Sequence, residues 1–297
     1  MKVLNFGSLN LDLVYQMDHI VRGGETFAAD RLDKFPGGKG LNQSVALAKA
    51  GAEVYHAGNI GTDGTMLTDT LAAAGVNTDH VRVLEIPSGH AVILVDRGGE
   101  NSIILFGGAN VSVDPEQVEA VLSHFGPGDF LVLQNEINML DTIIRKACDK
   151  GMQIVLNPSP MDEKIGKLPL EKVSIFKLNE IEGCAITGKE DPEEILDVLG
   201  QRFPGARVVL TLGSRGSVYM EGSTRIRQEI YKVKAVDTTA AGDTFTGFFI
   251  STLLRGGTPA QTLDVAARAS AIAVSRMGAA PSIPSWDEVE NWKGQKD

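Results

Sequence analysis

Short apolar runs alternate with longer helical patterns along most of this chain. The runs have the length and composition of buried strands, and clear examples are Val3–Phe6, Phe130–Gln134, Ile154–Asn157, Ile175–Leu178 and Val208–Leu212. Helical patterns that end close to a glycine lie at Asn42–Ala50, Pro115–Phe125, Met139–Lys150 and Pro192–Phe203. Strands that alternate with helices usually form a parallel sheet covered on both faces. The pattern predicts a doubly wound α/β fold with a mostly parallel sheet.

Two segments depart from this alternation. Glu25–Phe35 is short and mixed in polarity, and His90–Phe106 has the pattern of two strands joined at Arg97–Glu100. Neither segment contains a crossover helix, so we expect both to be extended and separate from the main pattern. The full length of 297 residues suits one large α/β domain, predicted here over residues 1–297.

The run Val236–Gly247 carries the strongest chemical signal. It reads Val-Asp-Thr-Thr-Ala-Ala-Gly-Asp-Thr-Phe-Thr-Gly and leads into an apolar helix expected to begin at Gly242. Unpaired N–H groups and the helix dipole favour an anion at such a terminus, and Ala240 and Ala241 are small enough for a phosphate to approach. The Asp243 carboxylate can accept a proton from an attacking hydroxyl. These residues predict phosphoryl transfer to an alcohol, although an aspartate here can also merely cap the helix.

The same run resembles the C-terminal signature of the ribokinase-like family of carbohydrate kinases. A second signature of that family is matched by Pro36–Gln43, which reads Pro-Gly-Gly-Lys-Gly-Leu-Asn-Gln, and the opening Gly7–Asp12 has the family's form. Further matches follow in the family's order at Asn157–Pro160, Asn179–Glu182 and Thr211–Gly216. The resemblance therefore covers essentially the whole chain.

The resemblance implies an ATP-dependent kinase with a small β-sheet lid over its sugar site. The lid would be formed by two inserted segments, at approximately residues 13–35 and 88–108. Gly242 and Asp243 would supply the anion hole and the catalytic base, and backbone N–H groups from Ala240 and Ala241 onward would bind the developing charge. We also expect a homodimer formed through the lid.

Polar residues after the first strand are candidates for the sugar site. Asn10 and Asp12 lie where open α/β sheets bind ligands, and their side chains can bond sugar hydroxyls, but they can equally stabilise a turn. Gly38 permits close backbone approach, and Lys39 and Asn42 add donors, although a plain glycine turn before a helix would look similar.

One more sugar ligand comes from the resemblance alone. It assigns Glu136 to the sugar site, whereas the residue by itself is compatible with a surface loop carboxylate. With Asp243, the predicted sugar contacts are Asn10, Asp12, Gly38, Lys39, Asn42 and Glu136.

For the nucleotide, the resemblance implies that Asn179 and Glu182 help to organise magnesium and phosphates, commonly through water. Magnesium suits oxygen ligands and keeps its waters. The same spacing also fits a helix cap with an acid in the first turn. The resemblance further implies nucleotide contacts from Thr211, Gly213, Gly216 and Gly242.

The resemblance also implies a potassium ion beside the anion hole. Six residues would supply its oxygen ligands, from side chains or backbone: Asp237, Thr239, Ala273, Arg276, Gly278 and Ser282. One position departs from the family. Ala267 stands where many relatives have a polar residue beside the adenine, which leaves base selectivity open.

Composition limits the other classes of function. The net charge of −10 argues against a general nucleic-acid or anionic-membrane surface. Cys148 and Cys184 are too few for a disulfide framework, so they indicate a reducing compartment. The apolar N-terminal run is broken by Asn5, Asn10 and Asp12, so we expect no signal peptide, no membrane span and a cytoplasmic location.

Other nucleotide-binding and hydrolytic motifs are missing from the sequence. No Gly-Lys pair is followed by Ser or Thr, as a Walker loop requires, and the first strand is not followed by Gly-x-Gly-x-x-Gly. The five histidines show no zinc-site spacing, and no Gly-x-Ser-x-Gly elbow is present. A dehydrogenase, a metallohydrolase and a serine hydrolase are therefore disfavoured.

We expect an ATP-dependent kinase that phosphorylates a primary hydroxyl of a free pentose, with ribose favoured. A nucleoside kinase or a sugar-phosphate kinase such as a 1-phosphofructokinase would share the signatures, and a catalytically inactive sugar-binding regulator is the non-enzyme alternative. Gln43 after Asn42 favours the ribokinase type. Ser88–Ala91 lacks the arginine that phosphosugar kinases tend to place there, and an intact Asp243 argues against the regulator.

Overall fold

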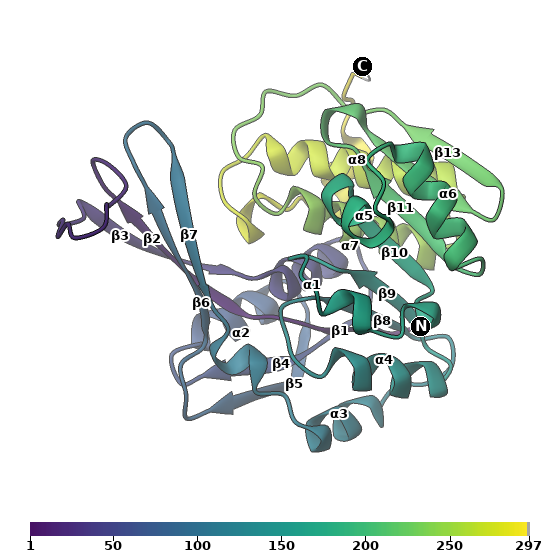
Figure 1. Cartoon of the computed structure of the whole chain (residues 1–297), viewed down its shortest axis with the longest axis horizontal. Helices are drawn as coiled ribbons and strands as arrows, with labels where there is room; N and C mark the ends of the chain where they lie inside the picture. Colours follow the sequence, from purple (N-terminus) through teal and green to yellow (C-terminus); the bar gives the residue numbers. More distant parts are fainter. Residues whose placement is uncertain (296–297) are drawn as a thin grey trace.

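A nine-stranded sheet runs through the body of the protein in the computed structural model (Figure 1). The structure describes residues 1–295, and the last two residues of the predicted 1–297 domain lie outside the described residues. From one edge to the other, the strands are β13 (Thr224–Gln228), β12 (Ser217–Glu221), β11 (Arg207–Thr211), β10 (Ile175–Asn179), β9 (Gln153–Asn157), β8 (Phe130–Gln134), β1 (Val3–Phe6), β4 (Val54–Gly61) and β5 (Asn77–Leu84).

The strands from β11 to β5 are parallel, and only the β11–β12 and β12–β13 pairs are antiparallel. Strand β1 lies between β4 and β8, so the strand order reverses there. In open α/β sheets, ligands bind beyond the carboxyl ends of the strands near such a reversal. The topology therefore predicts a ligand site near the carboxyl end of β1.

Helices cover both faces of this sheet. Their bounds are α1 (Lys39–Lys49), α2 (Thr65–Ala73), α3 (Pro115–Leu122), α4 (Leu140–Asp149), α5 (Glu180–Thr187), α6 (Pro192–Arg202), α7 (Ala241–Leu254), α8 (Pro259–Val274) and α9 (Trp286–Asn291). Short 3₁₀ helices lie at Gly108–Val111, Ile165–Lys167, Leu170–Lys172, Gly213–Arg215 and Ala280–Ser282.

Alternation along each strand divides the core into two layers. Leu131 and Leu133 of β8 pack with α3, α4 and α6 on one face, whereas Phe130 and Val132 pack with α1, α2, α7 and α8 on the other. Successive strand residues point to opposite faces, so a strand covered on both sides is apolar throughout. This explains the continuous apolar runs in the sequence.

A second sheet projects from the body and forms the lid (Figure 1). Its strand order is β3 (Arg31–Gly37), β2 (Asn10–Gln16), β6 (Gly89–Val95) and β7 (Asn101–Phe106). The predicted hairpin is present, and its turn contains Gly99 with a φ of 83°. Within the predicted segments, strand structure covers Arg31–Gly37 but not residues 25–30, and β2 begins at Asn10, before the approximate start of the predicted lid segment at residue 13.

The predicted strands and helices of the body are confirmed to within a few residues. Two helix ends differ by three residues, since α3 ends at Leu122 rather than at Phe125 and α1 begins at Lys39 rather than at Asn42. Its first turn therefore belongs to the glycine motif, and this places backbone N–H groups of that motif at a helix terminus. Among residues 1–295, no helix is long and apolar enough to cross a membrane.

Candidate active site

Helix α7 begins with unpaired backbone N–H groups, as the sequence predicts. Its N-cap is Ala240, which adopts the left-handed conformation with a φ of 58° and makes no side-chain cap. Such a backbone costs a non-glycine residue about 1–3 kcal/mol, and strained residues of this kind cluster at functional sites. Among the described residues, the N–H groups of Gly242 and Asp243 have no hydrogen-bond acceptor. The terminus can therefore receive an anion.

The Asp243 carboxylate does not cap its own helix. Its Oδ2 accepts a 3.2 Å hydrogen bond from Asn42 Nδ2, and its Oδ1 accepts a 2.9 Å bond from Gln43 Nε2. Asp243 is only 8% exposed. The simple capping interpretation is therefore wrong, and the carboxylate is instead oriented by the first turns of α1.

A chain of buried amides continues behind Asp243. Gln43 also donates to Asn157 Oδ1, at 3.1 Å, and its Oε1 accepts from Gln134 Nε2, at 2.7 Å. Gln134 donates in turn to Asn5 Oδ1, at 3.0 Å. Buried polar groups that pair with each other restrict their rotamers. The carboxylate is thus connected to the carboxyl ends of three neighbouring strands, β1, β8 and β9.

The start of α1 approaches the β1–β2 turn very closely. Gly38 has a φ of 92°, and a Cβ at Gly40 would lie 2.4 Å from the backbone nitrogen of Ser8. No other residue fits at Gly40 without moving the backbone, and Gly38 occupies a conformation that favours glycine. The motif therefore fixes where α1 begins, and with it Asn42 and Gln43.

Glu136 is not a surface carboxylate. Its Oε2 accepts from the backbone N–H of Lys39, at 3.0 Å, and from the Ser8 hydroxyl. Burial raises the pKa of the Glu136 carboxyl above its ordinary value. A carboxylate at a helix N-terminus is stabilised by the helix dipole. The structure thus places Glu136 between the start of α1 and the end of β1.

Asn10 and Asp12 lie on β2, at the base of the lid. Asn10 is 7% exposed, and its Oδ1 accepts a 2.7 Å hydrogen bond from Asn110 Nδ2. The Asn110 side chain also accepts from the Leu9 backbone N–H, at 2.9 Å. Asn110 was not among the predicted site residues, because it lies after β7, the last lid strand in the sequence, and belongs to no motif. Its contacts fix the orientation of the Asn10 amide.

Asp12 carries a strongly perturbed carboxyl group. Burial, reinforced by the negative charge of Glu136, raises the pKa of Asp12 from 3.8 to about 6. A Cβ on Gly37 of the neighbouring strand would lie 2.1 Å from Asp12 Oδ2, so a glycine there makes room for the carboxylate. Perturbed carboxyl groups of this kind are frequent at functional sites.

The predicted nucleotide residues lie at the carboxyl ends of β10 and β11. Asn179 caps α5, its Oδ1 accepting from Glu182 N at 2.9 Å, while Glu182 Oε2 accepts from Asn179 N at 2.9 Å. Thr211 is the register partner of Asn179. Gly213 and Gly216 both have positive φ, and a Cβ at Gly216 would lie 2.0 Å from a backbone oxygen. Asn179 and Glu182 thus form the helix cap that their spacing predicts.

The six residues predicted to hold potassium lie on the loop before α7, in the last turn of α8 and on the segment after α8. Asp237 Oδ1 accepts from Thr239 N and its Oδ2 accepts from Gly278 N, both at 2.9 Å. The Ala273 carbonyl accepts from Arg276 N, and the buried Ser282 hydroxyl donates to Ala279 O. Although burial opposes it, these bonds to Asp237 hold the pKa of its carboxyl below the ordinary value. The oxygen atoms suit a large, weakly hydrated cation.

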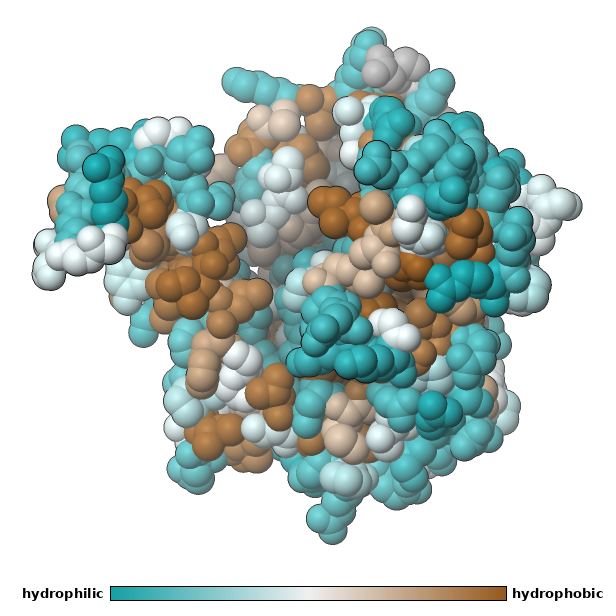
Figure 2. All heavy atoms as spheres, viewed as in Figure 1, coloured by the Kyte–Doolittle hydropathy of each residue, from teal (hydrophilic) through white to brown (hydrophobic). Residues whose placement is uncertain are grey.

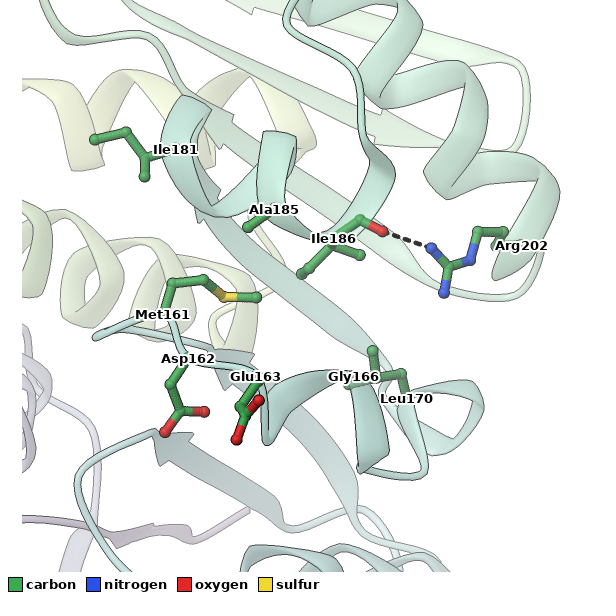
Figure 3. Close-up of a pocket in the computed structure, with 9 residues that line it drawn as sticks. All are labelled: Met161, Asp162, Glu163, Gly166, Leu170, Ile181, Ala185, Ile186 and Arg202. Atoms are coloured by element: carbon green, nitrogen blue, oxygen red, sulfur yellow. Dashed lines mark hydrogen bonds between the residues drawn. The ribbon is translucent and has the colours of Figure 1, made fainter.

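A pocket of about 430 Å³ lies elsewhere, between α5 and the segment after β9 (Figure 3). Met161, Ile181, Ala185 and Ile186 line it, and Arg202 donates a 2.6 Å hydrogen bond to the Ile186 carbonyl. None of the predicted site residues lines this pocket. We therefore locate the candidate site at the strand ends, where the polar network converges.

Comparison with known proteins identifies the family. The model of the pfkB family of carbohydrate kinases matches residues 1–286. The chain is 36% identical over 312 residues to the ribokinase of Schizosaccharomyces pombe, covering 97% of this chain and 96% of that protein. It is 34% identical over 301 residues to the ribokinase of Staphylococcus aureus, covering 97% and 98%. The chain belongs to the pfkB family of carbohydrate kinases.

Structural comparison agrees with this assignment. The solved structure of Arabidopsis thaliana ribokinase complexed with ribose and ATP superposes with a TM-score of 0.88, at 31% sequence identity, covering 97% of each chain. The predicted fold class is confirmed, and this pfkB-family chain is a phosphotransferase with an alcohol group as acceptor.

The Asp12 carboxyl predicts a specific pH dependence of stability. Because its pKa is raised in the folded state, ionisation of Asp12 disfavours folding as the pH rises from about 4 through about 6. Asp12→Asn removes this effect. At pH 7 the variant should exceed the native protein in free energy of unfolding by up to about 3 kcal/mol, with little difference near pH 4. Denaturant titrations between pH 4 and pH 7.5 test this, and a difference that does not change with pH would contradict it.

Proposed function

We propose that this pfkB-family kinase transfers the γ-phosphoryl group of ATP to a primary hydroxyl of a free pentose, with ribose favoured. The observation that carries the proposal is the position of Asp243. Its carboxylate is buried at the start of α7, beside unpaired N–H groups, and faces the first turns of α1. A proton acceptor and an anion site therefore adjoin each other. The relatives described above supply the substrate class.

In this reaction Asp243 accepts the proton of the attacking hydroxyl. The hydrogen bonds from Asn42 and Gln43 keep its carboxylate in one orientation, so the reacting oxygen meets a positioned base. Backbone N–H groups of Gly242 and Asp243 bind the negative charge that develops on the transferring phosphoryl group, with Ala240 and Ala241 leaving room for it. Phosphoryl transfer needs little more from a protein than this positioning and charge stabilisation.

The sugar would lie between the lid and the start of α1. Asn10, Asp12 and Glu136 offer acceptors to hydroxyl groups, while Gly38 and Lys39 lie at the helix terminus beside them. Asn42 has a buried side-chain oxygen without a partner among the described residues, so a sugar hydroxyl could complete its hydrogen bonding. Carboxylates grouped here would repel a phosphorylated sugar.

ATP would lie over the ends of β10 and β11. Asn179 and Thr211 are register partners at these strand ends, Gly213 and Gly216 follow β11, and Glu182 is buried in the first turn of α5. Among residues 1–295, no three histidine, cysteine or acidic side chains form a metal cluster. We propose magnesium as the metal ion, since it usually binds phosphates and waters and would neutralise phosphate charge.

The substrate assignment predicts the outcome of a panel assay. ATP consumption should be fastest with ribose or another free pentose and much slower with nucleosides or with fructose 1-phosphate and fructose 6-phosphate. Asp243→Asn should lower turnover by roughly two to four orders of magnitude, because the amide cannot accept the proton. Sugar affinity measured by calorimetry should remain. A higher specificity constant for a sugar phosphate, or near-normal turnover of Asp243→Asn, would overturn the proposal.

We further propose that potassium orders the loop beside the anion hole. Asp237 and Thr239 lead directly into α7, and Gly278 and Ser282 adjoin them on the segment after α8. A cation bound by Asp237, Thr239, Ala273, Arg276, Gly278 and Ser282 would help to orient N–H groups toward the phosphate.

Activity should therefore rise when tetramethylammonium is replaced by potassium at constant ionic strength and saturating magnesium, because the larger organic cation does not fit between carbonyl groups. Initial rates in the two buffers measure this. Equal rates would show that protein contacts alone hold the loop.

The lid offers a surface for a homodimer. Its edge strand β7 exposes a run of large apolar side chains: Ile103, Ile104, Leu105 and Phe106 are 55%, 61%, 56% and 49% exposed. Figure 2 shows apolar surface gathered over the lid strands. Edge strands with exposed apolar side chains are templates for pairing. We propose a second copy of this chain as the partner. We also propose a reducing cytoplasmic compartment, which the two free cysteines suit.

Ile104→Glu should therefore convert a dimer to a monomer in sedimentation velocity at micromolar concentration, since a buried charge opposes association. Val83→Glu is the matched control, because Val83 is 62% exposed on β5, outside the lid. A native protein that sediments as a monomer would contradict the proposal, as would equal effects of the two substitutions.

A further inference from the structure

A buried lysine faces the start of α7. Lys177 lies on β10, in the run Ile-Phe-Lys-Leu-Asn, and is 6% exposed. Its strand neighbours Phe176 and Leu178 pack into the core on the α6 side, whereas Ile175 packs on the α7 side. By strand alternation, the Lys177 side chain also points toward α7. It was not among the residues predicted to form the site.

The Lys177 ammonium reaches the anion hole itself. A Cβ added at Gly242 would lie 3.2 Å from Lys177 Nζ. The absence of a side chain at position 242 thus leaves a space that the ammonium group borders. This space also borders the Gly242 N–H group, which has no acceptor among the described residues.

Among residues 1–295, no group pairs with this ammonium. Only longer-range charges act on Lys177 Nζ, and the one hydrogen bond of Lys177 in this region is made by its backbone carbonyl, although most charged side chains buried to this degree are paired. Burial lowers the pKa of Lys177, and the nearby charges of Glu182 and Asp243 oppose this while Lys39 adds to it. An unpaired buried cation is costly unless a ligand completes its coordination.

We propose that Lys177 is a catalytic residue whose ammonium group binds the terminal phosphate of the nucleotide at the start of α7. A phosphate oxygen placed beside Gly242 would accept from Lys177 Nζ and from the Gly242 N–H group together. The inference rests on the proposed kinase function and adds a residue to it.

The proposed contact matters most in the transition state. During transfer, the bond from the γ-phosphorus to the bridging oxygen of ADP breaks, a bond to the sugar oxygen forms, and Asp243 takes the hydroxyl proton. Negative charge spreads over the phosphoryl oxygens in this process. An ammonium held in place and shielded from water stabilises that charge more than solvent does.

Lys177→Met tests the assignment, because methionine keeps most of the side-chain volume and removes the charge. We expect kcat to fall about 100-fold or more, the usual effect of losing one such donor. Sugar affinity by calorimetry should stay within about threefold of the native value. Because an unpaired buried charge is removed, the thermal unfolding temperature should hold or rise.

Nucleotide affinity gives a readout that needs no sugar. The native protein should bind the non-hydrolysable analogue β,γ-imido-ATP more tightly than Lys177→Met does, by about tenfold, while ADP affinity changes much less. Lys150→Met is the matched control. Lys150 follows α4, at the opposite end of the strands from the site, and this substitution should change neither quantity.

The outcomes separate the two proposals. A Lys177→Met variant with native kcat and native analogue affinity overturns the role of Lys177. Lower kcat accompanied by weaker sugar binding and a lower unfolding temperature also overturns it, since the lysine would then be structural. If the native protein phosphorylates no pentose, the proposed substrate fails, whereas the two nucleotide affinities still decide whether Lys177 binds the terminal phosphate.

Discussion

The close contact between α1 and α7 is the interaction on which the site depends. A Cβ at Gly247 would lie 2.4 Å from Ala46 Cβ, so the two helices approach as nearly as their backbones allow. Asp243 lies one turn before Gly247, and Gln43 lies one turn before Ala46. The contact between two small residues therefore brings Asp243 within hydrogen-bonding distance of Gln43. Dense packing of interiors makes such a distance precise, because neither helix can shift without opening a void.

Positively and negatively charged groups lie around the contact between α1 and α7. The N-terminus of α1 faces the Glu136 carboxylate, and the N-terminus of α7 is left open with Lys177 beside it. The Glu136 carboxylate thus compensates the dipole of α1, whereas the N-terminus of α7 can still bind an anion. Asp12 and Glu136 place two carboxyl groups near the start of α1, and burial raises the pKa of both. This division matches the proposed binding of a free sugar on one side and of a polyphosphate on the other.

Most of the fold could be predicted from the sequence because a parallel sheet covered on both faces leaves a simple pattern. Continuous apolar runs identified the central strands, and the hairpin predicted at His90–Phe106 was recognisable from alternation alone. The start of α1 at Lys39 was placed three residues late, because three glycines look like a loop. The long-range contact between the Ser8 backbone and Gly40 overrides that local preference, and such contacts are not visible in local composition.

The site was predictable where a residue belongs to a motif and not where its role comes from tertiary contact. Asp243 was identified as a candidate because a carboxylate follows a run of small residues, whereas Asn110 contributes only through its hydrogen bond to Asn10, 100 residues away. Lys177 belongs to no motif, but its position in the sequence is unusual. A lysine in the middle of an apolar strand covered on both faces contradicts the pattern that predicts the strand, since lysine is rarely buried without a partner. The exception itself was therefore the signal, because a charge placed in a fully covered strand needs a compensating charge, and the open N-terminus of α7 adjoins Lys177.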